Sequence, residues 1–237
     1  MRGPPFSRPW IARAGIVPWY ARKGGGSALA TDFGGYTTGI AAPDWTEQWN
    51  AADQNHTIEA KGGTISGKVL RLVNTTFAAK TLLWDEIPAG QDFEVLLKVS
   101  KPTQWESYDV MPVIRCSGDG SAKFAYAAYR PGQSSLLRVR FGSGDSGTSS
   151  ETSLGSFTVE SWAHGTPCWV RFRLSGGELG LKLWNEGSAE PGAFESTTII
   201  GTVNPDGGVG VGAFRNGTLD FEWFSVGLNG DTAPSPP

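Results

Sequence analysis

The chain has 237 residues, 33 of them glycine, and its length allows one large β-domain or two small ones. The net charge is −3, but residues 1–31 hold five basic residues and no acidic one, which leaves 15 basic and 23 acidic residues in the rest, a charge of −8. An acidic body argues against a nucleic-acid-binding domain, whose basic stripe lies on the folded part.

The sequence offers no segment for a membrane. No run approaches the roughly 18 apolar residues that a membrane span requires. The apolar run 16–20 is too short for a signal peptide and contains Pro18. We therefore expect a protein that is made in a cytoplasm and kept there until assembly.

The first residues, 1–30, are predicted to form an extended docking arm. Four prolines oppose a helix, and Gly24–Gly26 form a flexible joint. A disordered linker rarely contains so many large apolar residues. We expect the arm to dock on a partner chain or on the domain's own surface; a solvated tail is the alternative. The residues expected to dock are Arg8, Trp10, Arg13, Trp19, Tyr20 and Arg22.

From residue 31 onward the pattern is strands and turns. Apolar residues alternate with polar ones in several segments, which is typical of strands with one dry and one wet face. The predicted strands are 68–73, 93–99, 110–115, 123–129, 137–141, 154–159, 170–174, 179–183, 197–203, 208–214 and 219–226. No convincing helix is present. The pattern predicts an all-β fold, an antiparallel β-sandwich over residues 31–230, followed by a flexible C-terminal tail at 231–237.

The two cysteines give a further expectation. Cys116 and Cys168 are too few for a disulfide framework, and no CxxC pair predicts zinc. Both lie in predicted strand sequence, which favours two buried thiols over a Cys116–Cys168 bridge.

Four segments carry a family resemblance. They are 36–49, which includes Trp45 and Trp49; 58–72; 168–191, with Cys168-Trp169-Val170 and Leu183-Trp184; and 209–226, with its closing Leu219–Val226. Together they resemble the concanavalin A-like (laminin G-like) jelly-roll superfamily, and within it the domains of bacteriophage virion proteins. The resemblance implies a jelly-roll fold, whose members include lectins, hydrolases and inert structural domains.

Catalytic chemistry has little support in the sequence. Glycosidases on this fold use carboxylates spaced along one strand face. This chain offers Asp220-x-Glu222, with Thr218 and Phe224 at the flanking same-face positions, and we interpret it as the wet face of a strand. His56 and His164 lie in turn-like contexts and are expected to be exposed, and no Gly-x-Ser-x-Gly elbow is present. We predict no catalytic residue and no enzyme.

The sequence contains candidate residues for metal and for sugar binding. The resemblance allows calcium, for which the candidates are Asp53, Asn55, Asp119, Asp145 and Asp206, but no loop motif supports it and turn chemistry is favoured. No metal ligand is therefore assigned. Exposed aromatic rings stack on sugars, and the carbohydrate-binding candidates are Trp105, Tyr108, Tyr129 and Trp184; core packing is the alternative. Trp49, Trp84, Trp169 and Trp223 are expected to pack in the core or at a sheet edge.

The sequence thus predicts a non-enzymatic structural component of a bacteriophage virion, in the tail or as capsid decoration. Its arm would anchor it to other virion proteins, and its lectin-like sandwich would face outward. The alternative is a carbohydrate-binding module for host-surface glycans, and a glycoside hydrolase comes third. We expect a homo-oligomer that is assembled in the host cytoplasm and acts in the virion, with no membrane or nucleic acid as partner.

Overall fold

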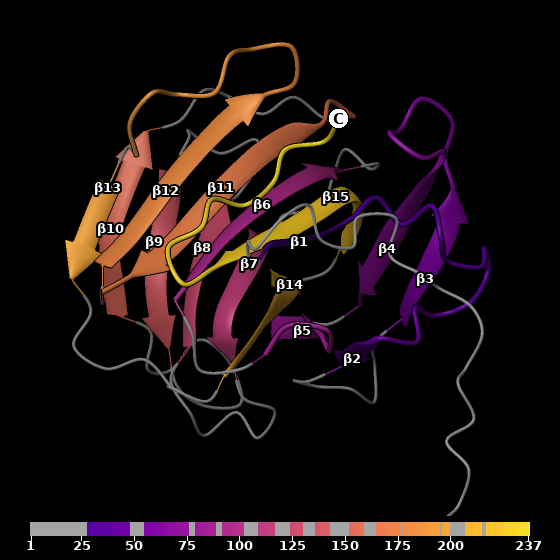
Figure 1. Cartoon of the computed structure of the whole chain (residues 1–237), viewed down its shortest axis with the longest axis horizontal. Coiled ribbons are helices and arrows are strands. Elements are labelled where there is room, and N and C mark those ends of the chain that lie inside the picture. Colours follow the sequence, from indigo (N-terminus) through magenta and orange to yellow (C-terminus); the bar gives the residue numbers. More distant parts are fainter. Residues whose placement is uncertain are drawn as a thin grey trace, which may run out of the picture.

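The computed structural model describes residues 28–47, 55–75, 79–88, 92–101, 109–116, 124–129, 136–142, 152–158, 165–176, 178–194, 196–199, 207–214 and 217–237. Within these ranges the chain is all-β, with fifteen strands in two antiparallel sheets and no helix (Figure 1). Accordingly, no helix in the described ranges is long and apolar enough to cross a membrane.

The eight-stranded sheet, called sheet A, contains both the first and the last strand. Its order is β13 (Ser196–Ile199), β12 (Glu178–Asn185), β11 (Cys168–Ser175), β6 (Phe93–Ser100), β15 (Gly217–Leu228), β4 (Lys68–Asn74) and β3 (Asn55–Ala60), and β1 (Ala28–Thr31) pairs with β15. β15 pairs with β6 along one of its edges. Along its other edge, β15 pairs first with β4, over residues 217–221, and then with β1, over residues 224–227. The first described strand and the last strand therefore lie side by side in the same sheet.

The seven-stranded sheet, called sheet B, packs against it. Its order is β10 (Thr152–Thr158), β9 (Leu136–Gly142), β8 (Phe124–Tyr129), β7 (Asp109–Cys116), β14 (Gly208–Phe214), β5 (Ala79–Trp84) and β2 (Trp45–Glu47). The predicted antiparallel β-sandwich is confirmed. Strands occupy the predicted segments, and the first described strand begins at Ala28, before the predicted start of the sandwich. The described part of β13 ends at Ile199, and residues 200–203 of that predicted strand lie outside the described ranges.

The core lies between the two sheets and follows the predicted alternation. In β6 the side chains of Phe93, Val95, Leu97 and Val99 all enter it. The neighbouring strands β11 and β12 contribute their alternate residues in the same way, for example Phe172. Each large apolar side chain so buried contributes roughly 1.5–3 kcal/mol. The sandwich is therefore held together by the alternation visible in the sequence.

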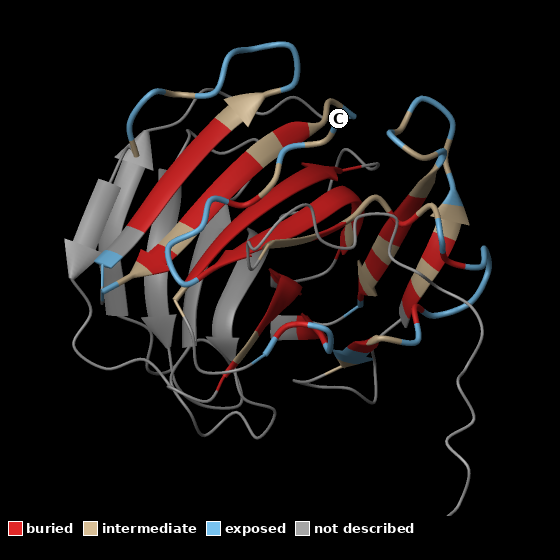
Figure 2. Cartoon of the chain, in the orientation of Figure 1, coloured by how far each residue is buried: buried red, intermediate tan, exposed pale blue. Residues whose placement is uncertain are grey.

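The outer side of strand β6 in sheet A is buried as well, which alternation alone does not predict. All eight residues of β6 are buried, including the four that point away from the core. The cover is the C-terminal segment, residues 231–237, which runs across β6 and β11 (Figures 1 and 2). Ala233 in this segment is 1% exposed. The prediction of a flexible tail is thus wrong at Ala233 and Pro234, because buried side chains of the sheet bind their backbone.

Gly227 gives a test of this docking. A Cβ atom at Gly227 would overlap the carbonyl oxygen of Asp231 and lie 2.7 Å from the carbonyl carbon of Thr232. We expect Gly227→Ala to lower the free energy of unfolding by about 1–3 kcal/mol, since a methyl group there displaces packed backbone. Urea denaturation measures it. Gly192→Ala, where a Cβ meets nothing within 4 Å, is the control, and equal midpoints for the two variants would contradict close docking.

Candidate functional site

A row of side chains crosses the outer face of sheet A near one end. The strand register places Trp184 of β12 opposite Trp169 of β11, Trp169 opposite Lys98 of β6, and Lys98 opposite Trp223 of β15. Side chains directly opposite on one face of an antiparallel sheet are close enough to touch. The register alone therefore brings three tryptophans and a lysine into one line.

Trp169 and Trp184, called the tryptophan pair, form the partly exposed end of this row. Their rings are stacked, with centroids 6.2 Å apart and an interplanar angle of 12°. Both are half-buried and pack against a small buried cluster that includes Leu96, Trp223 and Ala233. The Trp223 indole N–H donates to Ser225 Oγ at 3.1 Å and to the Pro234 carbonyl at 3.2 Å. The pair thus rests on a fixed floor and keeps part of its surface in solvent.

Lys98 supplies a charge next to the tryptophan pair. Its ammonium group lies 5.7 Å from the centroid of the Trp169 ring. It lies 2.6 Å from the Glu186 carboxylate and 2.9 Å from that of Glu222. Burial lowers the pKa of Lys98, but the hydrogen bonds to Glu186 and Glu222 outweigh it, and the net shift is upward. Lys98 is therefore charged and held between two carboxylates.

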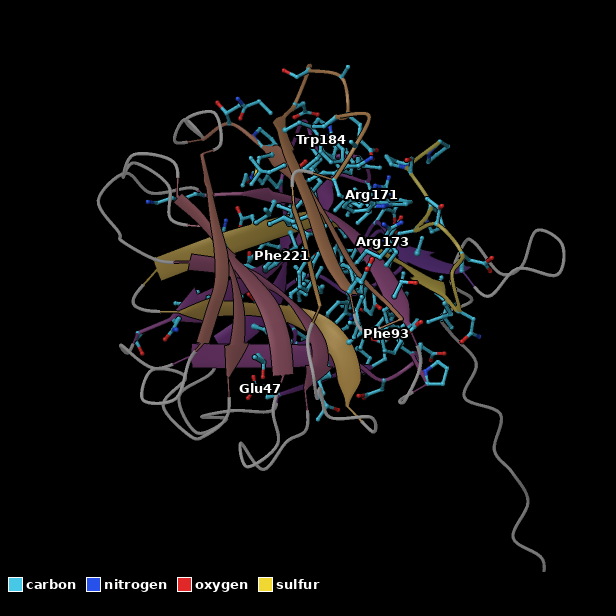
Figure 3. The ribbon with its side chains drawn as sticks, turned by 90° about the vertical axis from the view of Figure 1, so that its left-hand side faces the viewer. Glu47, Phe93, Arg171, Arg173, Trp184 and Phe221 are labelled. Carbon is cyan, nitrogen blue, oxygen red and sulfur yellow. The ribbon has the colours of Figure 1, made fainter. Side chains whose placement is uncertain are left out.

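Arg171 organises a second ionic cluster in the middle of the face. It donates to Glu94 at 2.6 Å, to Glu190 at 2.8 Å and to the Ala233 carbonyl at 3.1 Å. Lys182 also donates to Glu190, at 3.0 Å. Burial raises the pKa of Glu190, but the bonds from Arg171 and Lys182 hold it below its usual value. Figure 3 shows Trp184, Arg171 and Arg173 following one another along this sheet.

The loop after β12 folds back over the same face. Phe194 lies over the Arg173 guanidinium, 4.0 Å from its central carbon, and 4.9 Å from the Lys182 ammonium. Gly180 leaves room for the ring, since a Cβ there would lie 2.9 Å from Phe194. Glu190 and Phe194 thus both attach the loop after β12 to charged side chains of β11 and β12.

The predicted carboxylate pair, Asp220 and Glu222, is buried rather than wet. The exposed fractions are 0% and 2%. Asp220 accepts from Lys61 at 3.1 Å and from Arg71 at 2.8 Å, and the bond to Asp220 raises the pKa of Arg71. A β-bulge between Phe221 and Trp223 shifts the alternation. For that reason Phe224 lies in the core, not on the face of Asp220 as predicted.

A separate contact joins the edge strands of the two sheets. His56 of β3 is 8% exposed, and its Nδ1 lies 2.6 Å from Glu47 Oε1 of β2. The prediction of an exposed loop histidine is therefore wrong for His56, while His164 lies outside the described ranges. Figure 3 places Glu47 and Trp184 at opposite ends of the view.

A half-buried aspartate at the edge of the aromatic core makes a further polar contact. Asp44 accepts from the Tyr36 hydroxyl at 2.8 Å and from the Trp84 indole at 3.0 Å. Burial and the neighbouring Asp44 charge raise the pKa of Tyr36, so this phenol stays protonated. Trp84 packs in the core as predicted.

The sequence-based candidates divide into described and undescribed ones. Trp184 lies where predicted, on the face opposite Leu181 and Leu183. Tyr129 lies in β8, but the structure does not describe its side chain. The other candidates lie outside the described ranges: Trp49, Trp105, Tyr108 and the arm residues Arg8, Trp10, Arg13, Trp19, Tyr20 and Arg22. Trp169 was assigned to packing; its place opposite Trp184 in the paired strands is the signal that could have found it.

Cys168, the first residue of β11, faces the core. Cys168 is a free, buried thiol whose pKa is raised by burial, so it is not bridged to Cys116. Among the described residues, no group of three or more His, Cys, Asp or Glu side chains is placed to hold a metal ion. The calcium candidate Asn55 lies in β3, and Asp53, Asp119, Asp145 and Asp206 fall in ranges that the structure does not describe.

Comparisons with known proteins address the fold. No protein family and no curated protein matches the sequence. The carbohydrate-binding module CBM66 from Bacillus subtilis matches in structure with a TM-score of 0.51 and 12% identity, over 84% of this chain and 99% of that one. The CBM2 module of the evolved Dit of Lactobacillus casei BL23 phage J-1 matches with a TM-score of 0.53 and 12% identity, over 86% of this chain and 96% of that one.

A third match is the GH43 protein BlXynB from Bacillus licheniformis, with a TM-score of 0.52 and 14% identity over 84% of this chain. This chain spans only 39% of that protein. At these identities the three matches show the fold alone, an antiparallel β-sandwich.

Arg171 provides a test of the ionic cluster. We expect Arg171→Met to lower the free energy of unfolding by about 3–5 kcal/mol, because it leaves Glu94 buried without its partner. Arg173→Met is the matched control, since Arg173 lies on the same strand and face and stacks on Phe194, worth about 1 kcal/mol at most. Chemical denaturation measures both. A loss for Arg171→Met no larger than for Arg173→Met would contradict the role of the cluster.

Proposed function

We propose that this chain is a non-enzymatic carbohydrate-binding module and that the tryptophan pair is its site. The observation that carries the proposal is the stacked, half-exposed pair on a buried floor. The apolar C–H face of a sugar ring packs on an indole, which has a large surface and few rotatable bonds. Because the rings are already stacked and supported, little side-chain freedom is lost on binding.

Polar groups beside the rings would orient the sugar. The Glu186 carboxylate is 43% exposed and bonds Lys98 through Oε1, 2.6 Å away. A carboxylate has several acceptor positions, so the same group can also accept from a sugar hydroxyl. An apolar surface with a few placed polar groups is the usual design of a small-molecule site.

The comparisons support this proposal at the level of fold. Two of the matching structures are named as carbohydrate-binding modules, and this chain covers nearly all of each. The fold also occurs in hydrolases. The proposal of a non-enzymatic role therefore depends on the positions of the candidate acidic residues. Asp220 and Glu222 are buried and bound to Lys61, Arg71 and Lys98, which favours an ionic structural role over acid–base work.

Trp184 tests the proposed site. We expect Trp184→Ala to weaken the binding of any glycan detected on an array by about ten-fold or more, since a lost contact of 1.4 kcal/mol is a factor of ten. Trp184→Phe should keep most of the binding because it keeps a ring. Titration calorimetry with the full chain measures both.

The control is Ile65→Ala, an exposed apolar residue on the β3–β4 hairpin. If Trp184→Ala binds like this control while Trp105→Ala or Tyr129→Ala loses binding, the module stands but the site is elsewhere.

A virion location is the second proposal. It is supported by the basic, aromatic arm of residues 1–30 and by the fold match to a module of a phage Dit. The arm would hold the chain on other virion proteins as a homo-oligomer, leaving the sandwich free to meet host glycans.

Particle composition tests the virion location. We expect the full chain to sediment with purified phage particles, detected by mass spectrometry, and a chain without residues 1–26 to be absent from them. A truncated chain that is incorporated at the normal level would remove the arm from this role.

A further inference from the structure

Resting on the proposed function, we propose that the tryptophan pair selects uncharged or cationic glycans and rejects anionic ones. In each ion pair of this face, one partner is buried and the other faces solvent. Beside the tryptophan pair the buried partner is the cation and the exposed one is the carboxylate.

The exposed fractions show this orientation. The Lys98 side chain is 5% exposed and that of Glu186 is 43% exposed. In the neighbouring cluster the side chains of Arg171 and Lys182 are 5% and 11% exposed, whereas that of Glu190 is 31% exposed. These three pairs therefore present negative charge outward.

The orientation reverses at the other end of the same face. Over β4 and the β3–β4 hairpin, the cations are outward, with Arg71 33% and Lys61 31% exposed. Their acidic partners are buried, with the Asp220 side chain 0% and that of Glu222 2% exposed. The outer face of sheet A is thus polarised along the sheet order, negative at the tryptophan pair and positive over β4.

Three further charges of the described residues lie near the face, and none belongs to the row of the tryptophan pair. Arg173, half-buried, lies under Phe194, and the register places it two residues beyond Arg171 on β11, farther from Trp169. Glu59, half-buried, faces Arg71 from β3. Lys68 donates to the carbonyls of Gly34 and Tyr36. None of the three is bound to a residue of the row that contains the tryptophan pair.

A ligand on the tryptophan pair therefore meets an exposed carboxylate and a shielded ammonium. Lys98 already bonds Glu186 and Glu222 and has little surface left to offer an anion. A carboxylate, sulfate or phosphate group on the sugar would lie close to Glu186 and be repelled. An ammonium group would be attracted, and a hydroxyl would find an acceptor. One like charge near 4 Å at a surface weakens binding by at least about five-fold.

The test is an array of neutral, amino and anionic oligosaccharides probed with the full chain. It includes galacto-oligosaccharides with oligogalacturonates, and N-acetylated chito-oligosaccharides with their deacetylated forms. We expect each anionic member to bind at least five-fold more weakly than its neutral counterpart. Equal or tighter binding of the anionic members would overturn the selectivity and leave the module intact. If no glycan of any class binds, the proposed function fails and this inference fails with it.

Glu186 tests the cause of the selectivity. Glu186→Lys should raise the ratio of anionic to neutral binding by about five-fold or more, and the gain should shrink as salt is added. Glu178→Lys is the matched control, because Glu178 is an exposed carboxylate at the other end of β12. An unchanged ratio in Glu186→Lys, or the same change in Glu178→Lys, would show that Glu186 does not set the selectivity.

Discussion

The guanidinium of Arg171 joins parts of the chain that are far apart in sequence. From β11 it bonds Glu94 of β6, Glu190 of the loop after β12 and the Ala233 carbonyl of the C-terminal segment. A buried charge is tolerated only when several hydrogen bonds satisfy it, and the planar fork of arginine can reach three partners at once. The loop and the C-terminal segment are thus both bound to this one group. Because they cover the middle of the face, the tryptophan pair is left at its partly open end.

The alternation of apolar and polar residues was sufficient to predict the β-sandwich, but not the C-terminal segment that lies over its outer face. The alternation in 93–99 and 170–174 fixes which side chains enter the core, because every second residue of a strand points the same way. The same alternation predicts a wet outer face, and this failed. What covers it is Ala233, which is 62 positions from Arg171, and no local period reports a contact at that separation. The bulge between Phe221 and Trp223 likewise escapes a strict period of two.

The sequence predicted one of the two tryptophans of the proposed site, because only one of them can be placed from local alternation. Trp184 could be placed on the outer face because Leu181 and Leu183 define the inner one. The role of Trp169 depends on the register between β11 and β12, which places the two indoles opposite each other. A polar sequence context suggested that His56 is exposed, yet a bond to Glu47 on the other sheet accompanies its burial. Trp105, Tyr108 and Tyr129 stay predictions as carbohydrate-binding residues, because their side chains lie outside the described part of the chain.

Residue type alone could not decide what the carboxylates do. Asp220-x-Glu222 has the spacing of a strand-borne acid pair, and Glu186 has no motif at all. Burial distinguishes them. Asp220 and Glu222 are enclosed and form ion pairs with Lys61 and Lys98, whereas the Glu186 carboxylate faces solvent. The same kind of ion pair thus gives opposite surface potentials at the two ends of one sheet face, according to which partner is outside. The charge that each end of this face presents to solvent therefore follows from the orientation of the pairs rather than from the net charge of the chain.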